Sequence, residues 1–242
     1  MKQQIRKFKH ALKYLLRVFM IKIRNGPLKG EKWIAATASK FILGTYEPFK
    51  TAAYLQNLHE GDVVYDVGAH VGYYAAIAAT LVGKRGQVFA FEPRPLNIIY
   101  LKRHIQVNQM SNVQVIEACV GDKSRQCRFE TRTGTGTGHI SEQGDITVDM
   151  VCLDELFSEG ELPKPNFIKI DVEGGEVLVL EGARRVIQES QPIILVATHS
   201  DSKHKFVTDF LDSFGYKYRI LDKKGGSGDT EILALPKKQT IK

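Results

Sequence analysis

Residues 63–72 read VVYDVGAHVG, an apolar run that ends in a carboxylate and glycines, as a buried parallel strand does at a ligand crevice. Residues 167–176 read FIKIDVEGGE and repeat this pattern, and residues 88–93, VFAFEP, form a third run of the same kind. The carboxyl ends of parallel strands meet at one edge of a sheet, so we expect the three acidic ends to lie together. Such an edge would bind a polar, cationic or hydroxyl-rich ligand.

Strand patterns alternate with helix patterns along most of the chain, which predicts an α/β domain with helices on both faces of a mostly parallel sheet. The seven strands expected in this sheet are 62–67, 87–91, 113–120, 167–171, 192–197, 216–221 and 231–236. Helices or turns are expected at 33–43 and up to 58, and helices at 73–81, 95–107, 153–157, 176–189 and 203–214. A further strand is expected at 146–150. The last two strands flank the sequence GGSG at 225–228, which predicts a C-terminal antiparallel hairpin.

The chain has 242 residues, of which 43% are hydrophobic and 25% charged, an ordinary composition for a soluble globular domain. We expect a single domain over residues 31–242, preceded by a separate helical segment at 1–30. The three cysteines, Cys119, Cys127 and Cys152, form no CxxC pair and are odd in number. This argues against a disulfide framework and favours a reducing compartment, the cytoplasm.

The basic charge of the chain is concentrated at its N-terminus. Residues 1–24 carry eight Lys or Arg and no acid, whereas the net charge of the whole chain is +7, so the rest is close to neutral. Apolar residues recur every three or four positions from Ile5 to Ile23, which predicts a basic amphipathic helix. Arg17 interrupts its longest apolar stretch, which is then too short to span a membrane. The helix could lie on the inner face of a membrane, pack on the domain or pair with a second subunit.

The glycines after the first strand indicate which ligand the crevice binds. Gly68 and Gly72 permit a sharp turn and a close approach of a ligand to the backbone. Their G-x-x-x-G spacing differs from the G-x-G-x-x-G of dinucleotide sites, which argues against a nicotinamide-dependent oxidoreductase. Asp66 would favour a ligand ammonium group, and Glu92 could accept hydrogen bonds from both hydroxyls of a ribose. S-adenosylmethionine, with its ribose, adenine and amino-acid parts, is the cofactor we expect.

Over residues 44–199 the chain resembles the FkbM family of S-adenosylmethionine-dependent methyltransferases. The resemblance rests on the segments 44–47, 61–72, 91–93 and 168–176, together with Asn97, Asn108 and Gly182. It implies a Rossmann-like class I methyltransferase fold and methylation of a hydroxyl, most often on a sugar, a glycan or a glycosylated small molecule. One position departs from the family pattern. An acid commonly precedes the histidine that ends the fifth strand, and here Thr198 precedes His199.

The residues predicted to bind the cofactor lie in the turns and at the strand ends. They are Asp66, Gly68, Ala69, His70, Gly72, Glu92, Pro93, Asn97, Asp171 and Glu47. His70 could contact the methionyl part of the cofactor or cap the helix that follows it. Glu47, with Tyr46, could fold over the cofactor from its position before the core.

Two histidines are candidates for the general base that takes the hydroxyl proton. His199 lies where the fifth strand should open onto the crevice, and an imidazole has a suitable pKa near neutral pH. His139 lies in the glycine- and threonine-rich loop 131–139, which could close over the substrate or be an ordinary surface loop.

Lys169, Asp171 and Glu173 complete the predicted catalytic residues. Lys169 and Asp171 face the same side of their strand, where they could form an ion pair. Alternatively, Asp171 could contact the sulfonium, and Lys169 the substrate oxygen or a neighbouring carboxylate. Glu173 could contact the substrate or share a metal with Asp171, but two carboxylates are too few to specify a metal site, so no metal is predicted.

The sequence also allows three other classes of acceptor, namely a lipid, a protein or a nucleic acid. The near-neutral charge of the domain argues against nucleic acid. The fourth strand also ends in Ile170, Asp171, Val172 and Glu173 rather than in the Asn/Asp-Pro-Pro-aromatic sequence of base-amino methylation. A hydroxyl-bearing carbohydrate is therefore the favoured substrate, and the oligomeric state stays open.

Overall fold

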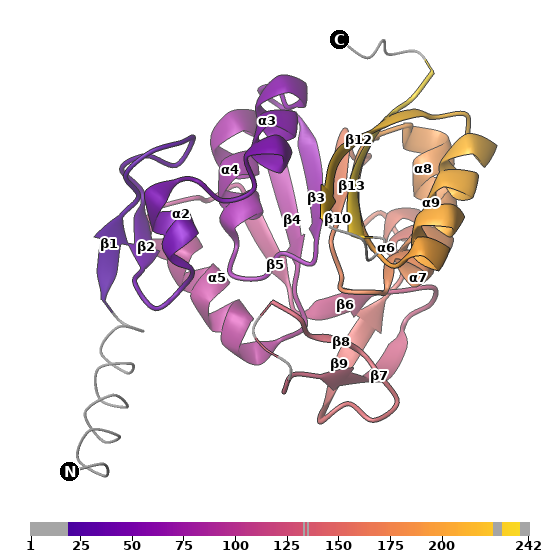
Figure 1. Ribbon diagram of the computed structural model, residues 1–242, viewed down its shortest axis with the longest axis horizontal. Helices are drawn as coiled ribbons and strands as arrows, with labels where there is room; N and C mark the ends of the chain where they lie inside the picture. The colour runs from indigo at the N-terminus through magenta and orange to yellow at the C-terminus, as the bar shows by residue number, and fades with distance from the viewer. Residues whose placement is uncertain (1–18, 133, 135, 225–228, 238–242) are drawn as a thin grey trace.

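The computed structural model describes residues 19–132, 134, 136–224 and 229–237 (Figure 1). Its centre is a seven-stranded sheet of order β12-β13-β11-β10-β3-β4-β5. The strands are Lys217–Lys224 (β12), Asp229–Leu235 (β13), Ile193–His199 (β11), Phe167–Ile170 (β10), Val63–Val67 (β3), Gln87–Phe91 (β4) and Val113–Ile116 (β5). The strands from β11 to β5 are parallel, and β13 and β12 are antiparallel. The predicted mostly parallel sheet with its C-terminal hairpin is confirmed.

Helices cover both faces of this sheet (Figure 1). One face packs against Pro48–Asn57 (α3), Tyr73–Val82 (α4) and Pro95–Val107 (α5). The other packs against Leu153–Ser158 (α6), Glu176–Glu181 (α7), Arg184–Ser190 (α8) and Asp201–Ser213 (α9). Side chains alternate between the faces, so Val64 belongs to one apolar cluster while Tyr65 and Val67 belong to the other. Both faces are buried, which explains the continuous apolar runs in the sequence.

A second, four-stranded sheet of order β6-β9-β7-β8 stands beside the first. Its strands are Ala118–Val120 (β6), Ile146–Val151 (β9), Arg125–Glu130 (β7) and His139–Ile140 (β8). The prediction of a single strand at 113–120 is therefore wrong, because β5 and β6 belong to different sheets. Glu117 lies between them, half exposed and ion-paired with Lys102. Since both strands are short, apolar and contiguous, the sequence pattern could not separate them.

The helix expected at 176–189 is also divided, into α7 and α8, at Gly182. A Cβ atom at Gly182 would lie 2.0 Å from the carbonyl oxygen of Gly121. The glycine thus lets the helical segment touch the chain that leaves β6. The remaining predicted elements from residue 62 onward agree with the structure to within about three residues.

The residues before α3 differ from two predictions. Met20–Lys22 (β1) and Lys32–Ile34 (β2) form an antiparallel pair, whereas a helix was expected over 1–30. Of residues 33–43, expected as helices or turns, Ser39–Leu43 form a helix (α2). Trp33 is fully buried and stacks on His104 of α5, with ring centroids 3.7 Å apart. Residues 20–34 therefore pack as part of the domain, and the boundary expected at residue 30 does not follow the packing.

Some predicted features lie outside the described residues. These are residues 1–18 of the expected basic helix and the turn at 225–228. Among the residues that are described, no helix has both the length and the apolar character needed to cross a membrane.

Candidate active site

The turn after β3 brings the ends of β3, β4 and β10 together. Gly68 has φ +81°, and a Cβ atom there would lie 1.9 Å from the carbonyl oxygen of Asp171. The amides of Gly68 and Ala69 both donate to the carbonyl oxygen of Phe91, at 3.1 and 2.9 Å. Gly72, with φ +89°, caps the N-terminus of α4, and a Cβ atom there would lie 2.3 Å from the Leu101 side chain. The positive φ favours glycine at both positions, and at Gly68 the backbone oxygen of Asp171 leaves no room for a Cβ atom.

Glu92 holds the glycine turn in shape from the end of β4. Its carboxylate accepts hydrogen bonds from the amides of His70, at 2.8 Å, and Arg94, at 3.0 Å, and from Asn97 Nδ2, at 3.1 Å. Burial raises the pKa of Glu92 to about 7, although these hydrogen bonds oppose the rise. Burial also lowers the pKa of His70 to about 4, so its ring is neutral at physiological pH.

A cavity lies between Glu92 and Asp171. Its apolar wall includes Phe91 of β4, Val120 of β6 and Phe129 of β7, so the second sheet closes one side. A smaller cavity meets it at three shared residues, Gly68, His70 and Asp171.

Most residues predicted to bind the cofactor line these two cavities. They are Gly68, His70, Glu92, Pro93, Asn97 and Asp171 in the larger cavity and Ala69 in the smaller one. Tyr46, from the segment before α3, lines the smaller cavity with Phe41 and Tyr73. Asp66, Gly72 and Glu47 do not line either cavity and act on it through other residues.

Asp66 and Lys169 form a buried pair beneath the glycine turn. Lys169 Nζ lies 2.9 Å from Asp66 Oδ1 and donates to the carbonyl oxygen of Gly68 at 2.8 Å. The two residues stand opposite each other in the parallel pairing of β3 and β10. Of the partners considered for Lys169, the structure therefore shows a neighbouring carboxylate, that of Asp66, rather than Asp171. Lys169 supports the turn from below while its side chain reaches the wall of the smaller cavity.

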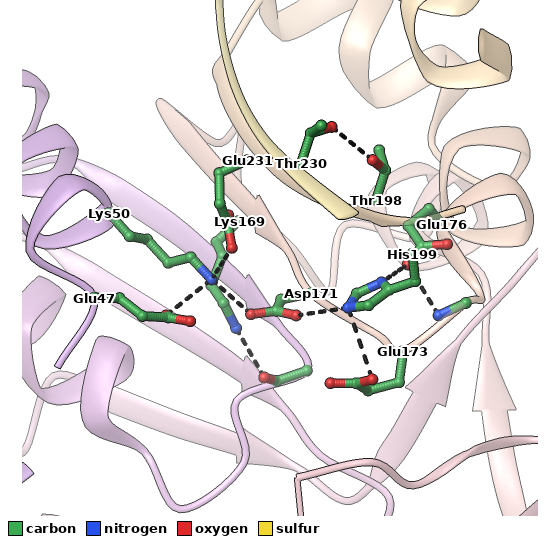
Figure 2. Close-up of polar contacts among 12 residues, drawn as sticks. Glu47, Lys50, Lys169, Asp171, Glu173, Glu176, Thr198, His199, Thr230 and Glu231 are labelled. Atoms are coloured by element: carbon green, nitrogen blue, oxygen red, sulfur yellow. Dashed lines mark hydrogen bonds and ion pairs between the residues drawn. The ribbon is translucent and has the colours of Figure 1, made fainter. Parts of the chain in front are cut away.

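Lys50 of α3 lies at the candidate site, and the sequence analysis did not predict it (Figure 2). It is 2% exposed, and its Nζ lies 2.8 Å from Asp171 and 3.0 Å from both Glu47 and Glu231. Glu47 also accepts a hydrogen bond from Tyr74 Oη at 3.1 Å. One ammonium group thus joins α3, the end of β10 and β13. Nothing in the local sequence around Lys50 distinguishes it from a surface lysine, since its partners come from distant strands.

Asp171 lies between Lys50 and His199 (Figure 2). Burial opposes its ionisation, but the charges of Lys50 and Lys169 outweigh burial and hold the pKa of Asp171 well below its usual range. Its Oδ1 lies 3.9 Å from His199 Nε2, and Glu173 Oε2 lies 3.7 Å from the same nitrogen. These three residues could together hold a metal ion, because one ligand atom from each lies within 4.8 Å of the others. His199 is the third ligand that the sequence prediction did not include.

Glu176 orients His199 from the other side of the ring. Its carboxylate is fully buried, and Oε1 contacts His199 Nδ1 and accepts a hydrogen bond from the amide of Gly174 at 2.9 Å. Burial alone would lower the pKa of His199, but the hydrogen bond to Glu176 and the nearby carboxylates raise it. Nε2, the other ring nitrogen, faces Asp171 and Glu173. Glu176 is the second site residue, after Lys50, that the sequence analysis did not predict. The signal that could have identified it is an acid at the start of a helix, three residues after Glu173.

Backbone strain is concentrated around the same cluster. Among the described residues, five that are not glycine have positive φ, and three of these are Glu47 (37°), His70 (53°) and Glu173 (51°). Such conformations cost roughly 1–3 kcal/mol each and persist where surrounding contacts enforce them, often at functional sites.

His139 is not brought to this cluster. It lies in β8, where its Nδ1 is 3.1 Å from the carbonyl oxygen of Thr137. Gly138 and Ile140, on either side, line the larger cavity. Because neighbouring residues of a strand face opposite ways, His139 faces away from the cavity.

The two cavities fit a cofactor such as S-adenosylmethionine. The larger one offers an apolar wall for a base and the Glu92 carboxylate, which can accept from hydroxyls. His70 Nε2 is buried with no hydrogen-bond partner among the described residues, and its ring lies on the wall that both cavities share. The acidic cluster at Asp171 suits a positively charged sulfur.

Comparison with known proteins assigns the chain to a family. The model of the methyltransferase FkbM domain matches residues 66–218, more than half of the chain. The chain belongs to the FkbM methyltransferase family. This match begins at Asp66 and includes the glycine turn, Glu92, Asp171 and His199.

Two proteins that are named as methyltransferases are similar in sequence to this FkbM protein. The hexuronic acid methyltransferase AglP of Haloferax volcanii is 34% identical over 159 residues, which are 65% of this chain and 64% of AglP. Protein-L-isoaspartate O-methyltransferase 1 of Archaeoglobus fulgidus is 41% identical, but over only 29% of this chain and 31% of that protein. The chain thus spans less than two thirds of either relative.

Solved structures confirm the Rossmann-like class I methyltransferase fold. An FkbM methyltransferase from Methylobacillus flagellatus superposes with a TM-score of 0.55 at 18% identity, covering 82% of this chain and 55% of that one. Aeropyrum pernix fibrillarin, with bound S-adenosyl-L-methionine, gives a TM-score of 0.50 at 16% identity, covering 77% and 74% of the two chains.

Proposed function

We propose that this protein transfers a methyl group from S-adenosylmethionine to a hydroxyl of a sugar, a glycan or a glycosylated small molecule. Membership of the FkbM family supports methyl transfer. The similarity to a hexuronic acid methyltransferase supports a sugar acceptor. The orientation of His199 by Glu176 is the observation that carries the choice of a hydroxyl, because a hydroxyl needs a base and a carboxylate acceptor does not.

The residues that would hold the cofactor follow from the cavities. Glu92 would accept hydrogen bonds from the ribose hydroxyls, and Phe91, Val120 and Phe129 would contact the adenine. The smaller cavity, between Tyr46 and Lys169, would take the amino-acid part. Asp171, kept ionised by Lys50, would lie beside the sulfonium.

When bound, S-adenosylmethionine supplies a methyl group on a positively charged sulfur, which leaves as a neutral thioether when a carbon–oxygen bond forms. The acceptor hydroxyl loses its proton to His199 Nε2. Glu176 keeps the other ring nitrogen, Nδ1, protonated and stabilises the resulting imidazolium. The negative charges of Asp171 and Glu173, within 3.9 Å of Nε2, stabilise the same cation.

Two measurements test this function. Titration calorimetry should detect binding of S-adenosylhomocysteine and none of NAD. Incubation of the protein with methyl-labelled S-adenosylmethionine and a panel of hexuronic acid and neutral glycosides should then give a labelled sugar. A methyl ether resists mild alkali, whereas a methyl ester on a uronic carboxylate releases methanol. Label on no carbohydrate, but on a protein or lipid acceptor, would contradict the proposal.

His199 could act as the general base or as a metal ligand, and a chelator distinguishes these two roles. If His199 is the base, dialysis against EDTA leaves turnover unchanged. If turnover is lost and returns with a divalent cation, then His199, Asp171 and Glu173 are metal ligands and the base lies elsewhere.

A further inference from the structure

Two carboxylates set the charge beside the ring nitrogen of His199 that would take the acceptor proton (Figure 2). Oδ1 of Asp171 lies 3.9 Å from His199 Nε2, and Oε2 of Glu173 lies 3.7 Å from the same atom. Both acids line the larger cavity. An acceptor hydroxyl must come within about 3 Å of Nε2 to give up its proton, so the groups next to that hydroxyl on the sugar lie beside these carboxylates.

Asp171 already has a cationic partner. Lys50 Nζ lies 2.8 Å from its Oδ2, although this ammonium group is shared with Glu47 and Glu231, each at 3.0 Å. In the proposed complex, the sulfonium of the cofactor is a second cation beside Asp171. The carboxylate of Glu173 therefore bears more directly on the charge of the acceptor.

Glu173 also stands where an acceptor would enter. Its side chain is 33% exposed, against 24% for Asp171. Its backbone has φ 51°, a left-handed conformation that is uncommon for residues other than glycine, asparagine and aspartate. Strain of this kind gathers at functional sites, where the side chain is needed in spite of the cost.

The nearby bases do not cancel this negative charge inside the cavity. Among the described residues, Arg94 is the one permanently charged base that lines the larger cavity, and its guanidinium donates to the carbonyl oxygens of Thr131, at 2.8 Å, and Gly134. Lys203 Nζ would lie 2.5 Å from a Cβ atom at Gly174, but neither Lys203 nor Gly174 lines a cavity of the site. The end of the cavity at His199 is therefore acidic.

We propose that the acceptor is an amino sugar, in which a protonated amine lies beside the methylated hydroxyl, and that Glu173 selects it. The proposal rests on the methyl transfer to a sugar hydroxyl proposed above. With the hydroxyl at His199 Nε2, an ammonium group on the neighbouring ring carbon can donate to Glu173 in a charge-assisted hydrogen bond, about twice as strong as a neutral one. A protonated amine has no lone pair, so the hydroxyl is the nucleophile.

The same carboxylates disfavour an acidic sugar. A carboxylate beside the hydroxyl would meet the like charges of Glu173 and Asp171, and such a contact rejects a ligand even where its shape fits. The acceptor of this protein would thus differ from the hexuronic acid in the name of its relative AglP.

Methyl glycosides of glucosamine, glucose and glucuronic acid test the charge preference. Their methylation is measured with methyl-labelled S-adenosylmethionine. We expect kcat/KM to be roughly 10–100-fold higher for the glucosamine glycoside than for the glucose glycoside, the factor for a hydrogen bond to a charged group. The glucuronic acid glycoside should be the poorest acceptor. The label on glucosamine should be on oxygen.

Glu173→Gln should bring the ratio of kcat/KM for the glucosamine and glucose glycosides close to one. A residue that only supported the fold would instead lower the turnover of all three sugars together. Glu142→Gln is the matched control, because Glu142 is exposed and lines neither cavity, and it should keep the preference. Lys203→Gln should keep it as well.

Binding of the three glycosides to the complex with S-adenosylhomocysteine separates this proposal from the proposed function. Methylation of sugars without a preference for the amine, or with glucuronic acid preferred, would overturn the amino-sugar proposal and leave methyl transfer to a sugar standing. A ratio that changes in Lys203→Gln but not in Glu173→Gln, or label on nitrogen, would also overturn it. Binding of glucosamine that depends on Glu173, without methylation of any sugar, would support the selection by Glu173 and contradict the proposed function.

Discussion

Lys50 Nζ lies 2.8 Å from Asp171 Oδ2, which ties α3 to the end of β10 across 121 residues of sequence. The same nitrogen contacts Glu231 of β13 at 3.0 Å. Burial raises the pKa of Glu231, whereas the pKa of Lys50 is raised well above its usual value because the three carboxylates outweigh burial. The contacts of Lys50 hold α3, and with it Tyr46 just before the helix, against the site.

Replacement of Lys50 by Met should destabilise the protein by about 3–5 kcal/mol, because it leaves buried carboxylates without their counter-charge. S-adenosylhomocysteine affinity should fall as well, since Asp171 loses the group that orients it. Lys205→Met is the control, because the Lys205–Asp209 pair is exposed and should contribute less than about 1 kcal/mol. Urea denaturation measures the free energy of unfolding of both variants. Equal losses of unfolding free energy in the two variants would refute a special role for Lys50.

Glu92 should make both stability and cofactor affinity depend on pH. Its pKa is raised to about 7 in the folded protein, so folding favours the protonated form. Its contribution to stability is therefore largest at acid pH and falls as the pH rises from about 4.5 through 7. Ribose hydroxyls donate more strongly to the ionised form, so S-adenosylhomocysteine affinity should rise between pH 6 and pH 8.

Calorimetry at both pH values checks this prediction for Glu92. Glu92→Gln should remove the pH dependence and lower the affinity at pH 8 by roughly 2 kcal/mol, the range for hydrogen bonds to a charged group. His199→Ala serves as the control and should keep the pH dependence. The assignment of Glu92 to the ribose fails if Glu92→Gln binds as tightly as the parent at pH 8.

His199→Ala should lower turnover roughly 10²–10⁴-fold, the usual effect of removing a general base. Cofactor affinity should be retained, because His199 lines neither cavity. Single-turnover methylation of the acceptor and calorimetry with S-adenosylhomocysteine separate the two effects. Full activity in this variant would move the proton acceptor to Glu173 or to another group.

Glu176→Gln tests whether Glu176 orients His199, because it should lower the pKa of His199, which a loss of packing alone would not do. The carboxylate of Glu176 raises the pKa of His199, so its neutralisation should lower that pKa. The acid limb of the pH–turnover profile should then move to lower pH. A fall in turnover with an unmoved acid limb would show that Glu176 acts only as a packing residue.

Gly68→Ala should cost about 2–5 kcal/mol, through positive-φ strain of about 1–2 kcal/mol and overpacking of about 1–3 kcal/mol against Asp171. Cofactor binding should be lost with it. Gly30→Ala isolates the strain, because Gly30 has φ +95° with nothing within 4 Å of a Cβ atom. Thermal unfolding of the pair measures the difference, and similar melting temperatures would contradict the close approach of β3 and β10.

The sequence by itself determined the sheet and the acidic strand ends, because these depend on local patterns. Apolar runs such as 63–67 read as buried parallel strands, and Gly68 and Gly72 indicate the turn without knowledge of their neighbours. The order of strands and helices then predicted that Glu92 and Asp171 lie at one edge. The glycine spacing and the acids at the strand ends predicted the cofactor, and the family resemblance added the expected methylation of a hydroxyl.

The tertiary structure decided which charged group meets which. Lys169 pairs with Asp66 because β10 lies next to β3 in register, and Lys50 meets Asp171 because α3 packs over the sheet end. Glu176 meets His199 because the turn after β10 lies beside the end of β11. A charged side chain at the end of an element can reach several partners, and only the packing of distant elements selects among them.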